Sequence, residues 1–516
     1  MFFLRIALLS VLSPLTLKAD HCPVCLAYFH GRSPAPVVVK TQCCGHRFDL
    51  DCISRCFIDQ PIGSRRCAIC RQDPMPVVNL NTGESHPDTF FPDQTFYSAC
   101  LNGDLDQLNR SLAEGVNVNA VMTNGLTALL IASYRGHKAI VERLINAAAN
   151  LNAVDEAGAT ALFIAAQENN TDCVKLLINA EADINARAED GASPLFIATQ
   201  ENHIDCLKLL INAGADLNAV WIEDGATPLF IAAQKGNTDC VELLINAGAD
   251  INARAEDGAS PLFIATQENH IDCVKLLINA GADLNAVWIK DGTTPLFIAA
   301  QENHIDCLKL LINAGADINI PSENGITPLF ITAQEGNTDC VELLINAGAD
   351  LNLRNKSGST PLLIAAQKNH TDCLKLLINA GADINARTED GTTPLLIAAE
   401  KGNTDCVQLL INAGANINAR AEDGASPLFI ATQENHIDCV KLLINAGADP
   451  NAVWIGDVAT PLLMAVQEDN TDCVELLINA GADLNAVLSD GTTLLAIATG
   501  MGNADCERLL INAGAR

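Results

Sequence analysis

Most of the chain repeats one pattern of apolar and polar positions. Each copy has a short apolar run that resembles Pro-Leu-Phe-Ile-Ala, a polar stretch, a second run with apolar residues at helical spacing, and then Gly-Ala-Asp. Successive copies are 33 or 34 residues apart, and self-similarity at such a period is typical of stacked repeat arrays. The Ser or Thr that opens the first run marks the copies at Thr127, Thr160, Ser193, Thr227, Ser260, Thr294, Thr327, Thr360, Thr393, Ser426, Thr460 and Thr493.

Each copy predicts a turn followed by two helices. In one copy Asp190-Gly191 is a tight-turn pair, because glycine tolerates a positive φ. Ser193 can cap the first helix, Pro194 suits its first position, and Gly214 is placed to end the second helix. Apolar positions on one face of the second helix are Cys206, Leu207, Leu210 and Ile211. Neither helix pair can bury its apolar face alone, so we expect the copies to stack into one continuous core.

These copies resemble ankyrin repeats over about residues 95–516, the stretch DGASPLFIATQENHIDCLKLLINAGADLNA being close to the family pattern. The resemblance implies a mainly α ankyrin-repeat solenoid of about 13 repeats. The usual His after Thr-Pro-Leu is Phe or Leu here, as at Phe163, Phe230 and Leu363. The copy near Thr95 is degenerate, as expected of a capping repeat.

Eleven of the 20 cysteines recur once per repeat, where the ankyrin pattern has Ile or Val. We interpret them as small buried apolar residues. Equivalent positions in stacked helices lie roughly 8–10 Å apart, which is too far for a disulfide. This many free thiols suits a reducing compartment. The eleven are Cys173, Cys206, Cys240, Cys273, Cys307, Cys340, Cys373, Cys406, Cys439, Cys473 and Cys506.

The charge of the chain is concentrated in the repeats. The formal net charge is −31, and residues 93–516 hold 22 basic against 55 acidic side chains, a net −33. Nucleic-acid binding needs a basic footprint, so this balance argues against a nucleic-acid partner. It favours a basic protein partner or serves only solubility, and the sequence leaves both open.

Residues 1–19 have the pattern of a secretory signal peptide, with Arg5 before an apolar run from Ile6 to Leu17. The run is short for a membrane span and contains Pro14, and no later segment is suited to cross a membrane. Export and a retained apolar N-terminal segment both remain open.

Residues 20–71 hold four pairs of potential zinc ligands. In chain order the pairs are Cys22 and Cys25, Cys44 and His46, Asp49 and Cys52, and Cys67 and Cys70. Thiolate and imidazole ligands in four such pairs match the needs of two tetrahedral zinc ions. So short a segment, with few apolar residues, is expected to need the metal in order to fold.

The order and spacing of these pairs, with the stretch CGHRFDLDC, resemble a RING finger, a small α+β zinc module. The resemblance implies that one zinc is held by the first and third pairs and the other by the second and fourth. Asp49 departs from the usual Cys or His, and Cys43 could replace Cys44 as a ligand. A disulfide-stapled exported domain is the alternative, although it leaves His46 without a role.

RING fingers of this kind act as ubiquitin ligases that hold a ubiquitin-charged conjugating enzyme in a reactive pose, without a covalent nucleophile. The resemblance places conjugating-enzyme contacts at Val24 and Ile69, and at Arg71 the basic side chain that bridges ubiquitin and the enzyme. Cys56 and Ala68 stand where the family often has Trp and Pro. An ordinary solvated arginine is the alternative for Arg71.

Residues 72–94 contain four prolines and no helical periodicity, which predicts a linker before the array. Within the array, three turns carry one extra residue and read Asn-Ala-Val-Trp-Ile, at Trp221, Trp288 and Trp454. Aromatic side chains at projecting turns could anchor a substrate. Packing of each Trp against the neighbouring turn is the alternative.

Together these features predict a RING-type ubiquitin ligase that binds a protein substrate through its ankyrin array, with ubiquitin and its conjugating enzyme as further partners. The alternative is a non-catalytic ankyrin scaffold with a structural zinc module. An exported protein that acts in a reducing cytosol would reconcile the signal-like start with the free thiols; a cytoplasmic protein is the other possibility.

Overall fold

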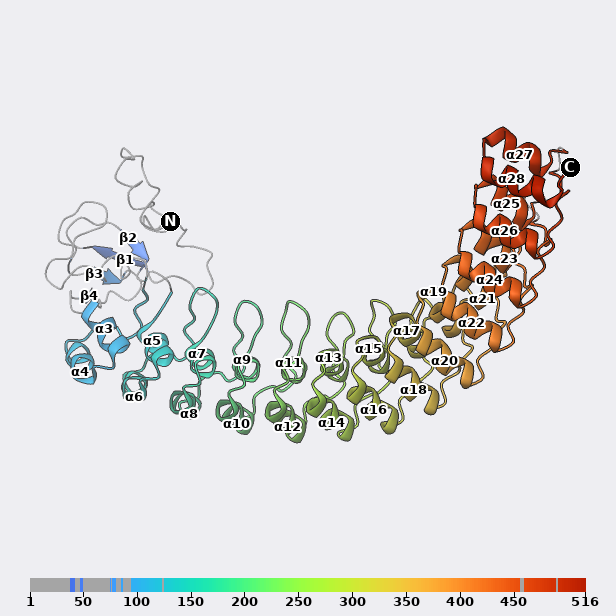
Figure 1. The fold of residues 1–516 in the computed structure, drawn as a ribbon. Coiled ribbons are helices and arrows are strands. Elements are labelled where there is room, and N and C mark those ends of the chain that lie inside the picture. The colour runs from blue at the N-terminus through green and yellow to red at the C-terminus, as the bar shows by residue number, and fades with distance from the viewer. Residues whose placement is uncertain are drawn as a thin grey trace, which may run out of the picture. The chain divides into compact units, whose positions relative to one another are not determined.

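The computed structural model describes residues 94–122, 125–454, 459–488 and 491–516, together with Met75 and four short strands nearer the N-terminus. The chain forms two compact units, Met1–Glu256 and Asp257–Arg516. In each unit, pairs of helices follow one another in chain order, as Figure 1 shows. The residues proposed for zinc binding, apart from Asp49, lie outside the described residues, as do Val24, Ile69, Arg71 and residues 1–19.

The four strands form one antiparallel sheet in the first unit, in the order β2-β1-β3-β4. The pairing sets Val39 of β1 between Phe48 of β2 and Asn79 of β3. Strands β3 and β4 fall within residues 72–94, the range interpreted as a linker, and Val77 of β3 is buried. The strands are β1 (Val38–Thr41), β2 (Arg47–Asp49), β3 (Val77–Asn79) and β4 (Ser85–His86).

The described part of the array holds 26 helices, which agrees with the predicted solenoid of about 13 helix pairs. In the first unit they are α3 (Gln94–Asn102), α4 (Leu105–Ala113), α5 (Ala128–Arg135), α6 (Lys138–Asn146), α7 (Ala161–Gln167), α8 (Thr171–Asn179), α9 (Pro194–Gln200), α10 (Ile204–Asn212), α11 (Pro228–Lys235) and α12 (Thr238–Ala247).

In the second unit the first helices of the pairs are α13 (Pro261–Gln267), α15 (Pro295–Gln301), α17 (Pro328–Glu335), α19 (Pro361–Lys368), α21 (Pro394–Glu400), α23 (Pro427–Gln433), α25 (Pro461–Gln467) and α27 (Leu494–Met501). The second helices are α14 (Ile271–Asn279), α16 (Ile305–Ala314), α18 (Thr338–Asn346), α20 (Thr371–Asn379), α22 (Thr404–Asn412), α24 (Ile437–Asn445), α26 (Thr471–Asn479) and α28 (Ala504–Ala513).

Between the terminal pairs, the first helix of each pair is short and buried on nearly all sides, whereas α3 and α27 have exposed faces. In α9 the hydroxyl of Ser193 accepts a hydrogen bond from the Phe196 backbone N–H at 3.1 Å, and Pro194 is the first helical residue, as predicted. Residues 194–199 are all buried, because α7 and α11 pack on either side of α9. Small side chains such as Ala198 let these neighbouring helices approach closely.

The second helix of each pair is amphipathic. In α10 the buried side chains are Cys206, Leu207 and Leu210, which confirms three of the four predicted core positions, while Ile211 is only half-buried. Gly214 follows the helix with a φ of 85°, the left-handed conformation that the sequence predicts and that glycine adopts without strain.

Side chains at the start of each second helix tie it to the preceding pair. His203 contacts the Ala166 carbonyl with its Nδ1 at 3.0 Å, and Asn337 donates from Nδ2 to the Ala300 carbonyl at 3.1 Å. Both acceptors lie at the end of a first helix, where carbonyls lack intrahelical partners. His and Asn are therefore interchangeable at this position because both offer a ring or amide N–H at similar reach.

The repeated cysteine contributes a hydrogen bond that the sequence analysis missed. Asn303 follows α15 in the left-handed conformation, with a φ of 58°, and its Oδ1 accepts from Cys340 Sγ of the next pair at 3.2 Å. The same contact joins Cys206 to Asn169, Cys240 to Asn202, Cys307 to Asn269, Cys406 to Asn369 and Cys473 to Asn435. The array cysteines are buried and free of disulfides, as predicted.

Replacing Asn303 tests this contact. We expect Asn303→Ala to destabilise α15 and α16 by about 1–2 kcal/mol, because alanine is strained in the left-handed conformation and cannot accept from Cys340. Asn303→Gly removes only the acceptor and should cost less. Amide hydrogen exchange measures these local free energies. Equal exchange in both variants and the parent chain would contradict the assignment.

The buried thiols predict a loss of stability at high pH. Burial, with a further contribution from Asp339, raises the pKa of Cys340 from 9.0 to about 11. Burial likewise raises the pKa values of Cys307 and Cys473 to about 11. Between pH 9 and pH 11 these thiols stay protonated in the folded chain but ionise in the unfolded chain. The free energy of unfolding therefore falls over this pH range.

The measurement is the urea midpoint of the full chain as a function of pH. A matched variant with all three of these cysteines changed to alanine should start less stable but lose less stability across the same pH range. If the parent and the variant decline in parallel, the thiols do not cause the loss.

Candidate functional site

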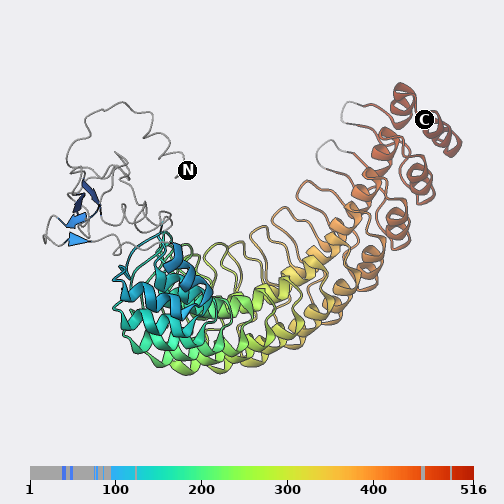
Figure 2. The same ribbon diagram turned by 90° about the vertical axis from the view of Figure 1, so that its left-hand side faces the viewer.

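The loops that precede the first helices project on one side of the helix pairs (Figure 2). A typical tip is closed by two hydrogen bonds, from the Ala188 N–H to the Ala192 carbonyl at 3.0 Å and from the Gly191 N–H back to the Ala188 carbonyl at 2.9 Å. Gly191 has a φ of 83°, the left-handed conformation that closes a three-residue hairpin loop after such a turn. The tips are the parts of each repeat that the helical core does not constrain.

Neighbouring tips are joined backbone to backbone. The Glu189 N–H donates to the Ala157 carbonyl of the preceding tip at 2.9 Å, and the Glu256 N–H donates to Asp224 at 2.7 Å. Arginines add side-chain contacts between tips: Arg187 donates to the Val220 carbonyl at 3.1 Å. The tips therefore form a continuous hydrogen-bonded row within a unit, rather than separate loops.

The three tryptophan tips use a turn that is one residue longer. In the first, the Trp221 N–H donates to the Ala226 carbonyl and the Gly225 N–H donates to the Trp221 carbonyl, both at 2.9 Å. This i→i+4 closure accounts for the 34-residue step. Trp288 closes its tip in the same way toward Thr293, and the Trp454 N–H donates to the Ala459 carbonyl.

Each tryptophan packs on a phenylalanine of the preceding repeat. The ring centroids of Trp221 and Phe196 are 5.8 Å apart, those of Trp288 and Phe263 5.5 Å, and those of Trp454 and Phe429 5.6 Å. All three indoles are half-buried, and their Nε1 atoms are covered without a hydrogen-bond partner. The structure therefore shows the tryptophans packed within the array, which is the alternative to substrate binding that the sequence left open. A role of these tryptophans in substrate binding stays a prediction.

The side chains next to the tryptophan face solvent instead. Val220 is 42% exposed and Ile222 61%, and their counterparts Val287 and Ile289 are 39% and 64% exposed. Sequence reasoning named the aromatic residue and missed these aliphatic ones. The signal was present, because the neighbours of an inward side chain in extended backbone point outward.

The two fully described tryptophan tips differ in charge. Lys290 follows Ile289, lies 3.6 Å from Asp257 and covers the Trp288 ring at 4.7 Å. Burial raises the pKa of Asp257, but the Trp288 indole, the Ala259 N–H and Lys290 outweigh it, so the net pKa is lowered. The indole acts here as a nearby dipole, since its N–H does not meet hydrogen-bond geometry. In the first tip Glu223 stands where the second has Lys290.

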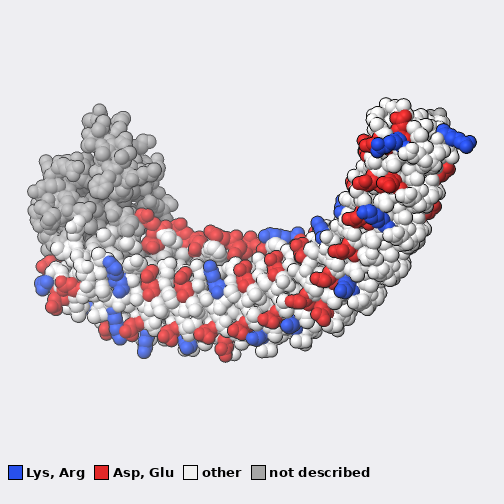
Figure 3. All heavy atoms as spheres, in the orientation of Figure 1, with Lys and Arg blue, Asp and Glu red and all other residues white. Residues whose placement is uncertain are grey.

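Acidic side chains gather along the loop edge of the first unit, over α7 and α9 (Figure 3). Glu156, Glu189, Glu223 and Asp224 are exposed there, and none of them forms an ion pair with the described residues. Because these charges are not neutralised, this edge is attractive to a basic partner.

Cysteine and histidine side chains of the array, which could act in catalysis elsewhere, are buried or hydrogen-bonded within the repeats. Burial raises the pKa of Cys100 to about 12, which disfavours the thiolate that a nucleophile needs. His304 and His370 contact backbone carbonyls of the preceding pairs. Among the described residues no group of three or more His, Cys, Asp or Glu side chains is arranged to hold a metal ion.

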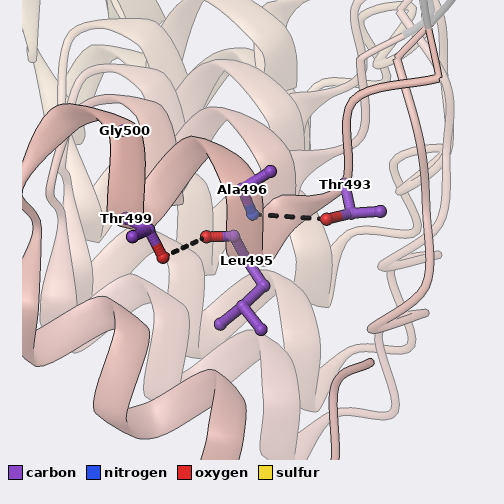
Figure 4. Close-up of a pocket in the computed structure, with 5 residues that line it drawn as sticks. All are labelled: Thr493, Leu495, Ala496, Thr499 and Gly500. Carbon is purple, nitrogen blue, oxygen red and sulfur yellow. Dashed lines mark hydrogen bonds between the residues drawn. The ribbon is translucent and has the colours of Figure 1, made fainter.

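A shallow hollow of about 480 Å³ lies on α27 and is lined by Thr493, Leu495, Ala496, Thr499 and Gly500 (Figure 4). Its polar groups bond to one another: Thr499 donates to the Leu495 carbonyl at 2.8 Å, and Thr493 accepts from the Ala496 N–H at 3.2 Å. Both threonine hydroxyls of the hollow are therefore already engaged in the local structure.

Of the predicted zinc ligands, the structure describes the backbone of Asp49 alone. Asp49 ends β2 and is paired with Val38 of β1. None of the described helices has the length and apolar character needed to cross a bilayer.

The fold and the tip row define a repeat solenoid with a projecting edge of loops. A family model described as ankyrin repeats (3 copies) matches residues 96–188, 181–255, 252–322, 314–388, 381–453 and 456–516. The chain therefore belongs to the ankyrin repeat family, whose arrays bind protein partners. A search of curated proteins finds no significant match.

The packing of the tryptophans generates a prediction. We expect Trp288→Ala to destabilise α13 and its neighbouring tip by about 2 kcal/mol, because the contact with Phe263 is lost from a half-buried site. Trp288→Phe keeps a ring against Phe263 and should lose less. Local hydrogen exchange distinguishes the two, and unchanged protection in the alanine variant would show that the indole does not support the repeat.

Proposed function

We propose that this protein is a RING-type ubiquitin ligase whose ankyrin array recruits a protein substrate. The observation that carries the proposal is the set of eight ligand-type residues between Cys22 and Cys70, in RING order and around a Cys-Gly-His stretch. The array supports the substrate-binding part of the proposal, since ankyrin repeats are protein-binding scaffolds and the tip row offers an exposed surface.

The donor set fits zinc. Six thiolates, one imidazole and one carboxylate are all established zinc ligands, and they divide into two groups of four. One zinc would be held by Cys22, Cys25, Asp49 and Cys52, and the other by Cys44, His46, Cys67 and Cys70. The metal supplies structural cross-links, and the chemistry of ubiquitin transfer takes place on the conjugating enzyme.

The chain's own part in that transfer is orientation. Val24 and Ile69 provide apolar contacts for the conjugating enzyme. Arg71 bridges the enzyme and ubiquitin with its several N–H donors, so that the reactive bond is held in the geometry for attack. A lysine of the substrate bound on the array is then the acceptor.

A non-catalytic scaffold is the second candidate. It is favoured by three departures from the RING pattern: Asp49 in place of a Cys or His ligand, Cys56 in place of Trp, and Ala68 in place of Pro. These changes weaken one zinc site and the surface for the conjugating enzyme. Under this candidate the zinc module serves only in association.

We further propose that the protein is exported and acts in a reducing cytosol. The signal-like residues 1–19 support export, and the free array thiols support a reducing place of work. Detection of the protein solely inside the cells that make it would refute export and leave the cytoplasmic alternative.

The test is ubiquitin discharge by the zinc-loaded full chain with a panel of charged conjugating enzymes. We expect discharge by the parent chain and a loss of about tenfold or more in Arg71→Ala, because the oriented complex loses a charge-assisted contact. Arg65→Ala is the matched control, and zinc content should be equal in all three. A fully loaded chain that discharges none of the panel would refute the ligase and leave the scaffold.

A further inference from the structure

One position in the tip row is apolar where other tips are charged. The residue whose N–H bonds to the preceding tip is a glutamate or lysine in several tips, as in Glu189, Glu256, Glu323 and Lys356. In the first tryptophan tip it is Ile222, whose N–H donates to the Asp190 carbonyl at 3.0 Å. The exposed isoleucine therefore occupies a solvent-facing position that normally carries charge.

Ile222 is held in place although it is 61% exposed. Its Cγ1 lies over Gly191, where there is no room for a Cβ. Its backbone is fixed by the bond to Asp190, and Val220, also exposed, is fixed by the contact of its carbonyl with Arg187. An apolar side chain that is ordered before binding loses little conformational entropy on docking.

The surroundings of Ile222 are acidic. Glu189, Asp190, Glu223 and Asp224 are exposed around it and form no ion pair with described residues. Arg187 is the base on the same pair of tips, and its guanidinium is engaged by the Val220 carbonyl. An exposed aliphatic side chain within an unneutralised acidic rim is complementary to a basic segment that carries an aliphatic residue.

The duplicated tip at Ile289 supplies a contrast within the same chain. Ile289 is seated over Gly258 and is 64% exposed, so the apolar part of the two tips is alike. Lys290 replaces Glu223 there and pairs with Asp257, so this rim holds three acidic side chains and one base where the first rim holds four acidic side chains. Of the two fully described tryptophan tips, the one at Ile222 therefore has the more acidic rim.

From this geometry we propose that the tip around Ile222 docks a basic segment of a partner protein, with an aliphatic side chain of that segment packed on Ile222 and Val220. The inference rests on the array being the substrate-binding part of the proposed ligase. It narrows the substrate class to proteins that present a Lys- or Arg-rich segment with an embedded Leu, Ile or Val.

The test begins with a random-sequence peptide library selected on the folded full chain. We expect the enriched peptides to be basic with an aliphatic residue. Their affinity should fall about tenfold or more in Ile222→Ser and in Glu223→Lys, which copies the second tip. The matched variant Ile289→Ser should bind as the parent does, and circular dichroism checks that all variants fold.

A gain-of-function variant completes the experiment. Lys290→Glu should give the second tip the same four acidic side chains as the first and raise the binding stoichiometry from one to two peptides, as measured by calorimetry. The proposal is overturned if the library returns no peptides, only acidic or neutral ones, or basic ones indifferent to Ile222. Ubiquitin discharge is measured on the same variants. A variant that loses peptide binding but keeps discharge, or one that keeps peptide binding but loses discharge, shows that the docking site and the ligase activity are separate.

Discussion

Each helix pair of the array is held in its folded form by stacking on its neighbours. The first helices between the terminal pairs are only about two turns long and are buried on nearly all sides, as with residues 194–199 of α9. A helix this short is not stable in isolation. Such a helix is buried by the helices before and after it. The stability of a repeat therefore depends on its interfaces with neighbouring repeats as well as on its own contacts.

Hydrogen bonds between repeats reinforce this stacking in a regular way. The Asn that ends one first helix accepts from the cysteine of the next pair, and the His or Asn that starts each second helix contacts the preceding first helix. The His and Asn contacts at the start of the second helices satisfy carbonyls that helix ends leave without partners. At the six cysteines that contact an Asn, the thiol also does what another apolar residue would not do: it supplies a weak donor to the Asn oxygen.

The same arrangement leaves the loop tips available for function. Because the helices and inter-repeat bonds hold the array together, a tip can accept an extra residue without disturbing its neighbours. The tryptophan tips show this: the indole packs inward on a phenylalanine, the turn becomes one residue longer, and Ile222 and Val220 are turned outward. Lys290 then changes the charge of one duplicated tip while its apolar part stays the same.

The repeat, its period, the caps at Ser193 and Gly214, and the burial of the cysteines could all be predicted from the amino-acid sequence. These features depend on local periodicity and on the φ preferences of single residues, and each is repeated many times. The orientation of the tip side chains, with the tryptophan packed inward and its neighbours exposed, emerged from the three-dimensional structure. The ion pair between Asp257 and Lys290 emerged in the same way. Those outcomes depend on residues about 30 positions apart in the chain, whose distance is set by how one repeat stacks on the next.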